Sequence, residues 1–241
     1  FKTDINYTLI IVHMPADQDK LYSHVKFLTE LRPYRNYMNV ESLERVVGYL
    51  KNHLLQWGYE PKEQTWKAQG REYKNLIATY NPEKSKRLIV GAHYDVFGEM
   101  PGVDDNASAV AGLLETARLL SELQPDLDYR VEFVAYCLEE PPFFGTDKMG
   151  SYIHAKSLNK NKIDVIGMIC YEMIGYFSEE PGSQLYPDER LREIYPDTGD
   201  FIVVVGIEEY REFTEKVFTN MKLINEVDTQ VICFPDKHGY A

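Results

Sequence analysis

Apolar runs of strand length alternate with amphipathic helical segments along this chain, and this alternation limits the folds it can adopt. The run RLIVGAHYDV at 87–96 precedes a helical pattern over 105–122, and the run YRVEFVAYCLEE at 129–140 follows it. A strand, a helix and a second strand in this order form a βαβ unit, in which the two strands are parallel. The pattern therefore predicts an α/β fold whose mostly parallel sheet carries helices on both faces.

Similar patterns extend to both sides of this unit. Apolar residues recur at helical spacing over 40–57, between Asn39, a good N-cap, and Gly58, a good helix stop. Further strands are expected at 60–66, 75–80, 165–176, 201–207 and 227–234, and further helices at 146–159 and 208–222. The acidic loop at 178–200 has a length that is often associated with function.

Charge and composition limit the partners of the chain. It carries 26 Lys and Arg residues against 38 Asp and Glu residues, which gives a net charge of −12. Because nucleic-acid binding needs basic patches, this balance argues against nucleic acid and fits a peptide, a small molecule or cations. No apolar run approaches the length of a membrane span. The chain starts at Phe1, so its compartment is not indicated.

Three cysteines without a CxxC pair are expected to be buried free thiols.

A more informative set of polar residues follows the apolar runs. In parallel α/β sheets, ligands bind beyond the carboxyl ends of the strands. Acidic or imidazole groups follow three of the expected strands and occupy one intervening loop: His93, the pair Glu139 and Glu140, Glu172, and the pair Asp104 and Asp105. These groups are therefore expected to converge on one rim of the sheet.

Each of these groups also has an ordinary structural interpretation. His93 alone could be a core or edge histidine, the two glutamates a solvated strand end, and the two aspartates the mouth of a helix. Glu172 interrupts an apolar stretch, where an unpaired carboxylate would be costly. Together, however, four or more carboxylates on one rim would repel one another. One or two divalent cations remove that repulsion, and imidazole with carboxylates suits zinc, with manganese or cobalt as alternatives.

Four motifs within 91–177 carry a family resemblance: GAHYD, PGVDDNASAVAGLLE, CLEEPPFFGTDKMGS and YEMIGYF, in this order. They resemble the dizinc aminopeptidases of metallopeptidase family twenty-eight, in clan MH. The resemblance implies a three-layer zinc-exopeptidase fold of the phosphorylase/hydrolase-like type, with a mixed, mostly parallel central sheet. Residues 1–241 would then form a single catalytic domain. It also favours an exported or periplasmic protein and leaves the oligomeric state undefined.

The resemblance implies a role for each metal ligand. His93 would bind one zinc ion together with Glu172, which stands where the family usually has an aspartate. Glu140 would bind a second zinc ion, and Asp104 would bridge the two. In the family the peptide bond between the two adjacent aspartates is often cis. Asp105 with Asn106 would then shape and cap the turn that presents Asp104.

The resemblance also names the residues that act beside the metals. Glu139 would be the general base that takes the proton of a water held by two metal ions. Asp95 would fix the ring of His93 by a hydrogen bond. Because neighbouring residues of a regular strand point to opposite faces, the strand must twist at its end to bring both Glu139 and Glu140 to the rim.

The implied activity is the removal of N-terminal residues from peptides, with the acidic rim receiving the free α-amine. Several apolar residues near the expected rim suggest an apolar side-chain pocket: Phe143, Phe144, Met173, Ile174, Tyr176 and Phe177. Two alternatives stay open. A glutaminyl cyclase has the same fold and one zinc ion, although it usually lacks the Asp-Asp-Asn-Ala-Ser run. A non-catalytic binding domain could also retain the fold.

One family ligand has no clear counterpart in this sequence. The family has a further histidine near its C-terminal end, usually in a Ser-Asp-His segment, and His238 is the only late histidine here. We therefore expect either His238 or a histidine beyond Ala241 to complete the second metal site. The domain at 1–241 is accordingly expected to be incomplete at its C-terminal end.

Overall fold

The computed structural model describes residues 14–186, 189–224 and 226–235. Its centre is a sheet with the strand order β1-β2-β4-β3-β5. The strands are β1 (Lys62–Ala68), β2 (Arg71–Tyr80), β3 (Arg87–His93), β4 (Arg130–Tyr136) and β5 (Val165–Cys170). β4, β3 and β5 are parallel, whereas β1 and β2 are antiparallel to their neighbours. The carboxyl ends of the three parallel strands therefore meet at one edge, where His93 is paired with Tyr136.

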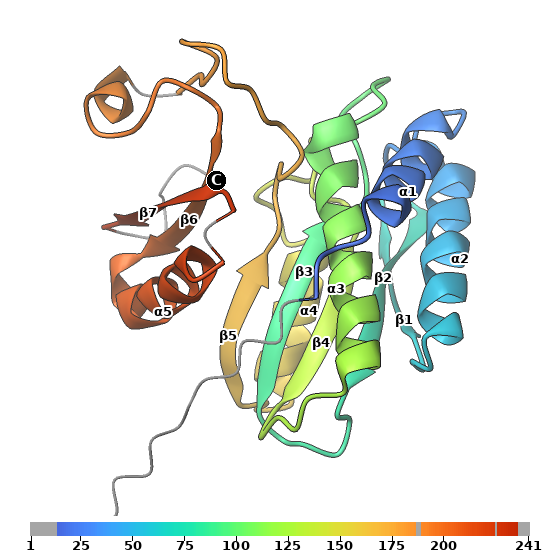
Figure 1. Cartoon of the computed structure of the whole chain (residues 1–241). Coiled ribbons are helices and arrows are strands. Elements are labelled where there is room, and N and C mark those ends of the chain that lie inside the picture. Colours follow the sequence, from blue (N-terminus) through green and yellow to red (C-terminus); the bar gives the residue numbers. More distant parts are fainter. Residues whose placement is uncertain (1–13, 187–188, 225, 236–241) are drawn as a thin grey trace, which may run out of the picture.

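Helices cover both faces of this sheet (Figure 1). One face carries α1 (Gln18–Glu30), α2 (Val40–Gln56) and α3 (Ala109–Leu123), and the other carries α4 (Gly150–Lys160). The larger part of the core lies beneath α2 and α3, and a smaller cluster around Ile89, Val134 and Leu158 lies beneath α4. The expected three-layer fold with a mixed, mostly parallel sheet is confirmed.

The apolar spacing of α2 explains why this segment is helical. Five residues at intervals of one, three or four positions are buried on one side: Leu43, Val46, Val47, Leu50 and Leu54. They form the apolar stripe that an amphipathic helix presents to a sheet. Asn39 does precede the helix, but its side chain donates to Tyr34 O at 2.7 Å and makes no cap hydrogen bond.

The C-terminal part of the described chain forms a smaller unit beside β5 (Figure 1). The strands β6 (Phe201–Ile207) and β7 (Asp228–Phe234) pair with each other in parallel and are packed against α5 (Arg211–Lys222). The two strands were expected as part of the central sheet, but they form a separate two-stranded sheet. Gly167 of β5 allows the contact with α5, because a Cβ at this position would lie 2.3 Å from the ring of Phe213.

Several elements are shorter than the sequence pattern suggested, and the difference falls at the candidate site. β3 ends at His93, β4 at Tyr136 and β5 at Cys170. The helix expected from residue 105 starts as α3 at Ala109, after the π-helical turn η1 (Val103–Ser108). The chemically interesting residues therefore lie on loops that leave the sheet edge, where side chains are not restricted by strand alternation.

Two further expectations concern the surface. None of the helices in the described ranges is long and apolar enough to cross a membrane. The three cysteines are free, but only Cys137 is buried, whereas Cys233 is half-buried and Cys170 is exposed at the end of β5. The expectation of three buried thiols is therefore wrong for Cys170, which ends the edge strand of the sheet, and is only partly met by Cys233.

Candidate metal-binding site

The imidazole of His93 lies at the centre of a group of carboxylates. His93 is the last residue of β3 and is only 3% exposed. Its Nε2 atom lies 3.2 Å from Asp105 Oδ1, 3.4 Å from Glu172 Oε1 and 3.7 Å from Glu139 Oε2. The structure therefore brings together residues from the ends of β3, β4 and β5 and from the turn before α3.

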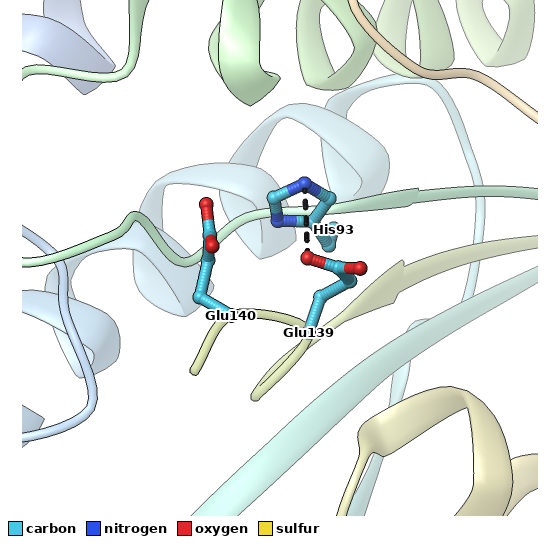
Figure 2. A group of neighbouring side chains, drawn as sticks. All are labelled: His93, Glu139 and Glu140. Carbon is cyan, nitrogen blue, oxygen red and sulfur yellow. Dashed lines mark ion pairs between the residues drawn. The ribbon is translucent and has the colours of Figure 1, made fainter. Parts of the chain in front are cut away.

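Glu139 and Glu140 both reach this rim because the chain leaves the strand before them. β4 ends at Tyr136, and Leu138 has a positive φ of 63° that turns the backbone. Figure 2 shows the two carboxylates on either side of the His93 ring, with Glu139 joined to it by the ion-pair contact. The expected departure from regular strand geometry is confirmed.

Asp95 organises this part of the site from behind. It is 1% exposed, and its Oδ1 atom lies 3.5 Å from His93 Nδ1. Its two carboxylate oxygens also accept the backbone N–H groups of Glu139 and Glu140, each at 3.1 Å. Asp95 therefore contacts His93, as the sequence led us to expect, and also fixes the loop that carries both glutamates.

The two adjacent aspartates point to different partners. Asp104 Oδ1 accepts the backbone N–H of Gly175 at 2.7 Å and the hydroxyl of Ser108 at 3.1 Å. Asp105 is the residue whose carboxylate reaches His93. The structure therefore does not bring Asp104 into the cluster, and Asp105, rather than Asp104, lies beside His93.

The backbone of η1 explains this difference. Asp105 has extended dihedral angles (φ −98°, ψ 94°) inside the turn, and the cis peptide bond joins Asp105 to Asn106. The cis bond is thus one residue later than expected. Gly175 allows its loop to approach Asp104, because a Cβ there would lie 2.7 Å from Ser108 Cβ. Asp104 is consequently hydrogen-bonded to the loop that follows β5.

Asn106 is a site residue whose contact with Glu172 the sequence did not reveal. It is fully buried, and its side-chain amide donates to Glu172 Oε2 at 3.0 Å and to Tyr171 O at 3.2 Å. Its Oδ1 atom accepts the backbone N–H of Met173 at 3.2 Å. Asn106 therefore orients Glu172, and the only signal for it in the sequence was its place after the two aspartates.

The electrostatics of the site favour protons or cations. Burial opposes a charge on His93, but the carboxylates of Asp105, Asp95 and Glu172 outweigh this effect and hold its pKa far above its usual value. Burial raises the pKa of Glu139 to about 7, and the neighbouring carboxylates add to the effect, while His93 opposes it. A rim with this balance attracts positive charge.

Two overlapping groups of side chains have the geometry of metal ligands. His93, Glu139 and Glu140 form one group, and His93, Asp105 and Glu172 form the other, with the ligand atoms of each group within 4.8 Å of one another. Within this rim, Asp105 Oδ1 is buried and has no hydrogen-bond partner. Since buried polar atoms are normally satisfied, and since imidazole and carboxylate are zinc ligands, these residues fit a divalent cation.

The other residues singled out in the sequence are more dispersed. Phe143 is buried, with its ring 5.5 Å from that of Tyr37, so it belongs to the core rather than to a substrate pocket. The remaining apolar residues of that set are exposed: Phe144, Met173, Ile174, Tyr176 and Phe177. His238 lies outside the described residues.

The three-layer fold and the histidine–carboxylate rim at the carboxyl ends of its parallel strands define an α/β protein with a candidate metal site at its sheet edge. Residues 75–212 match the model of peptidase family M28, and this match includes every residue of the rim. The chain belongs to peptidase family M28. The expected family membership is thereby confirmed.

Two relatives illustrate the match. The uncharacterised protein YfbL of Escherichia coli strain K12 is 43% identical over 199 residues, which cover 79% of this chain and 60% of YfbL. Leucine aminopeptidase 1 of Pyrenophora teres f. teres strain 0-1 is 26% identical over 188 residues, which cover 73% of this chain and 47% of that protein. The chain thus spans about half to three fifths of the length of these relatives.

Solved structures share the fold at lower identity. A leucine aminopeptidase precursor from Bacteroides thetaiotaomicron superimposes with a TM-score of 0.67 and 22% identity, covering 95% of this chain and 82% of that one. A glutaminyl cyclase from the same organism gives a TM-score of 0.66 and 21% identity, covering 92% and 79%. The fold is therefore common to both enzyme types.

Proposed function

We propose that this chain carries the active site of a metal-dependent aminopeptidase, which hydrolyses N-terminal residues from peptides. The observation that carries the proposal is the meeting of His93, Asp105, Glu172, Glu139 and Glu140, where the buried Asp105 Oδ1 has no hydrogen-bond partner. The M28 membership and the relative named leucine aminopeptidase support the same activity.

The geometry supports a division of roles within the rim. His93, Asp105 and Glu172 would hold one metal ion, and Glu140 would contribute to a second. Asp105 is the aspartate that would take part in holding metal here, because its carboxylate contacts His93. Zinc is the metal that this donor set favours, with manganese or cobalt as alternatives, and two ions would occupy a complete site.

Glu139 is the proposed general base. A bound divalent ion supplies Lewis acidity, which polarises a peptide carbonyl and makes water more acidic. Glu139 would accept the proton of the attacking water and deliver it to the leaving amine. Its Oε2 atom lies 3.7 Å from His93 Nε2, so its carboxylate is close to the proposed ligands. Asp95 keeps Glu139 in position through the backbone.

The surroundings of the rim support a peptide substrate with a free N-terminus. The carboxylates offer partners for an α-ammonium group, and side chains such as Phe144, Met173 and Ile174 are exposed on the loops that carry the rim. We propose that these apolar residues receive the substrate's first side chain.

The proposal is tested by measuring metal content and peptidase activity together. The purified protein should bind zinc, release p-nitroaniline from a panel of aminoacyl-p-nitroanilides, and lose this activity when a chelator removes the metal. Restored activity after zinc addition would support the proposal. A protein that binds zinc and hydrolyses none of these substrates would contradict it and would favour a non-catalytic binding domain.

Glutaminyl cyclisation is the second candidate, because solved glutaminyl cyclases share the fold with comparable TM-scores. Ammonia release from peptides with N-terminal glutamine, without hydrolysis of the next peptide bond, would identify this activity. The presence of two overlapping ligand groups favours the aminopeptidase, since a single-zinc enzyme needs only one of them.

A further inference from the structure

The strongest unassigned feature near the rim is a buried arginine. Arg35 lies on the segment between α1 and α2 and is 0% exposed. None of the ion pairs found among the described residues includes it. A buried cation without a carboxylate partner is costly, so its surroundings must compensate for the charge in another way.

Backbone carbonyls provide this compensation, and they come from three separate segments. Arg35 Nε donates to Tyr94 O at 2.8 Å, and one terminal nitrogen donates to Leu28 O at 3.0 Å and Pro101 O at 2.5 Å. The other terminal nitrogen donates to Gly102 O at 2.8 Å. The planar guanidinium group has five N–H donors in a fixed arrangement and bonds all four carbonyls, whereas an ammonium group has only three donors.

Two of these carbonyls belong to residues that are close in sequence to the proposed metal ligands. Tyr94 lies between His93 and Asp95, and Gly102 lies three residues before Asp105. The backbone of Arg35 adds to the link, because Val96 donates its N–H to Arg35 O at 3.2 Å. One side chain thus joins the segment that follows β3 to the turn that presents the aspartate.

The backbone at Gly102 packs closely against the Arg35 guanidinium. Gly102 has a φ of 56°, and a Cβ at this position would lie 2.9 Å from the Arg35 guanidinium and 2.3 Å from Asp105 O. Gly102 O also accepts the backbone N–H of Ala107 at 3.2 Å. Gly102 O therefore accepts from Arg35 before Asp105 and from Ala107 after it, so the guanidinium supports the turn that contains Asp105.

The positive charge of Arg35 also interacts electrostatically with Asp95 and Asp105. Burial lowers the pKa of Arg35 to about 10, while the negative charges of Asp95 and Asp105 oppose the shift. The guanidinium remains protonated at neutral pH, and it places a fixed positive charge behind two carboxylates of the rim.

We propose that Arg35 is a positioning residue for the metal centre, which holds the Asp105 turn at the distance from His93 that metal binding requires. This inference rests on the proposed function, since it assumes that the rim binds a metal. Arg35 has no contact with the rim side chains in the interactions described here and acts through the backbone of two loops.

The first test compares zinc affinity, measured by competition with a chelator, in the wild-type protein and the variants Arg35→Lys and Arg35→Met. Loss of a contact that orients ligands typically weakens metal binding by about 10–100-fold, and we expect both variants to fall in this range. Arg118→Met is the matched control, because Arg118 is similarly buried but bonds to Glu115 and Glu122 on α3.

The control separates positioning from general stability. Arg118→Met should lower the melting temperature and leave the zinc affinity unchanged. Arg35→Lys should weaken zinc binding even where its circular dichroism and melting temperature match those of the control. If Arg35→Met does not fold, Gly102→Ala provides a second route, since its Cβ would displace the same contact. Wild-type zinc affinity in Arg35→Lys and Gly102→Ala would overturn the inference.

A second test does not depend on the metal. In chelator-treated protein, the amide of Ala107 should exchange its hydrogen faster in Arg35→Lys than in the wild type or in Arg118→Met, because its acceptor Gly102 O is no longer held. Unchanged exchange would overturn the role of Arg35. Absence of zinc binding by the wild-type protein would instead overturn the proposed metal centre, so the two failures are distinguishable.

Discussion

The carboxylate of Asp95 accepts the backbone N–H of Glu139 at 3.1 Å, so a residue at the end of one strand holds the candidate base at the end of the next. The same carboxylate accepts the N–H of Glu140 and lies 3.5 Å from His93 Nδ1. One buried side chain therefore sets the relative positions of three rim residues.

Replacing Asp95 with asparagine should weaken metal binding. One of its two accepting oxygens would become an N–H donor and would face a backbone donor of Glu139 or Glu140. We expect zinc affinity to fall about 10–100-fold, as measured by chelator competition. Asp147→Asn is a suitable control, because Asp147 is exposed and pairs only with Lys148 among the contacts described. Equal affinities in the two variants would refute this role.

Replacing Glu139 with glutamine should remove the general base and leave the metal in place. The amide has nearly the same shape but cannot accept the proton, so turnover should fall by about 10²–10⁴-fold. Metal analysis of the purified variant provides the check. If metal is lost together with activity, Glu139 is a ligand and the roles of Glu139 and Glu140 must be exchanged.

The two adjacent aspartates should respond differently to the same change. Asp105→Asn should lower the metal content, because its carboxylate faces His93, whereas Asp104→Asn should retain the metal and disturb the loop that contains Gly175. Metal content and hydrogen exchange of the Gly175 amide measure the two effects. Metal loss confined to Asp104→Asn would restore the assignment that the sequence suggested.

Glu132 should make the stability of the protein depend on pH in the acid range. Burial would raise its pKa, but His154 and Arg87 outweigh this effect and lower the pKa below its usual value of 4.5. The ionised group therefore stabilises the fold above pH 4.5, and this contribution disappears as the pH falls through the lowered folded-state pKa.

The variant Glu132→Gln tests this expectation. It should lower the free energy of unfolding near pH 7 by about 1.5–3 kcal/mol, the range for hydrogen bonds to charged groups. It should also reduce the loss of stability on acidification, as followed by urea denaturation at several pH values. The exposed Glu30→Gln is the control, with an effect within about 0.5 kcal/mol. A parallel pH profile in Glu132→Gln and wild type would contradict the expectation.

Substrate recognition can be tested without mutation. If the acidic rim binds the α-ammonium group, acetylation of a peptide's N-terminus should abolish its cleavage. Mass spectrometry of paired free and acetylated peptides measures this directly. Efficient cleavage of the acetylated peptide, or cleavage at internal bonds, would indicate a peptidase of another type.

The sequence predicted the layers of the fold and most of the rim, because both depend on local patterns. Apolar runs of strand length revealed β3, β4 and β5, and the polar residues that follow them meet at one sheet edge as parallel topology requires. The helix α1 was missed, since it buries only His24 and Leu28 and has no strong apolar stripe.

Other features depend on contacts that a sequence does not display. The choice between Asp104 and Asp105 is made by the backbone of η1 and by the approach of Gly175, which lies about 70 residues away in the chain. Likewise, the pairing of β6 with β7 depends on where α5 packs, and Arg35 gave no signal because its partners are backbone carbonyls.

The pairing of β3 with β4 places His93 beside Tyr136, three residues before Glu139. A slip of one residue between these strands would move the glutamate loop by about 3.3 Å and turn one set of side chains to the opposite face. Metal–ligand distances tolerate deviations of only about 0.2 Å. A metal held by this rim would consequently bind only chains whose strands are in register, and by mass action it would draw the folding equilibrium toward them. Metal binding at this rim would thus also select the correct pairing of the central strands.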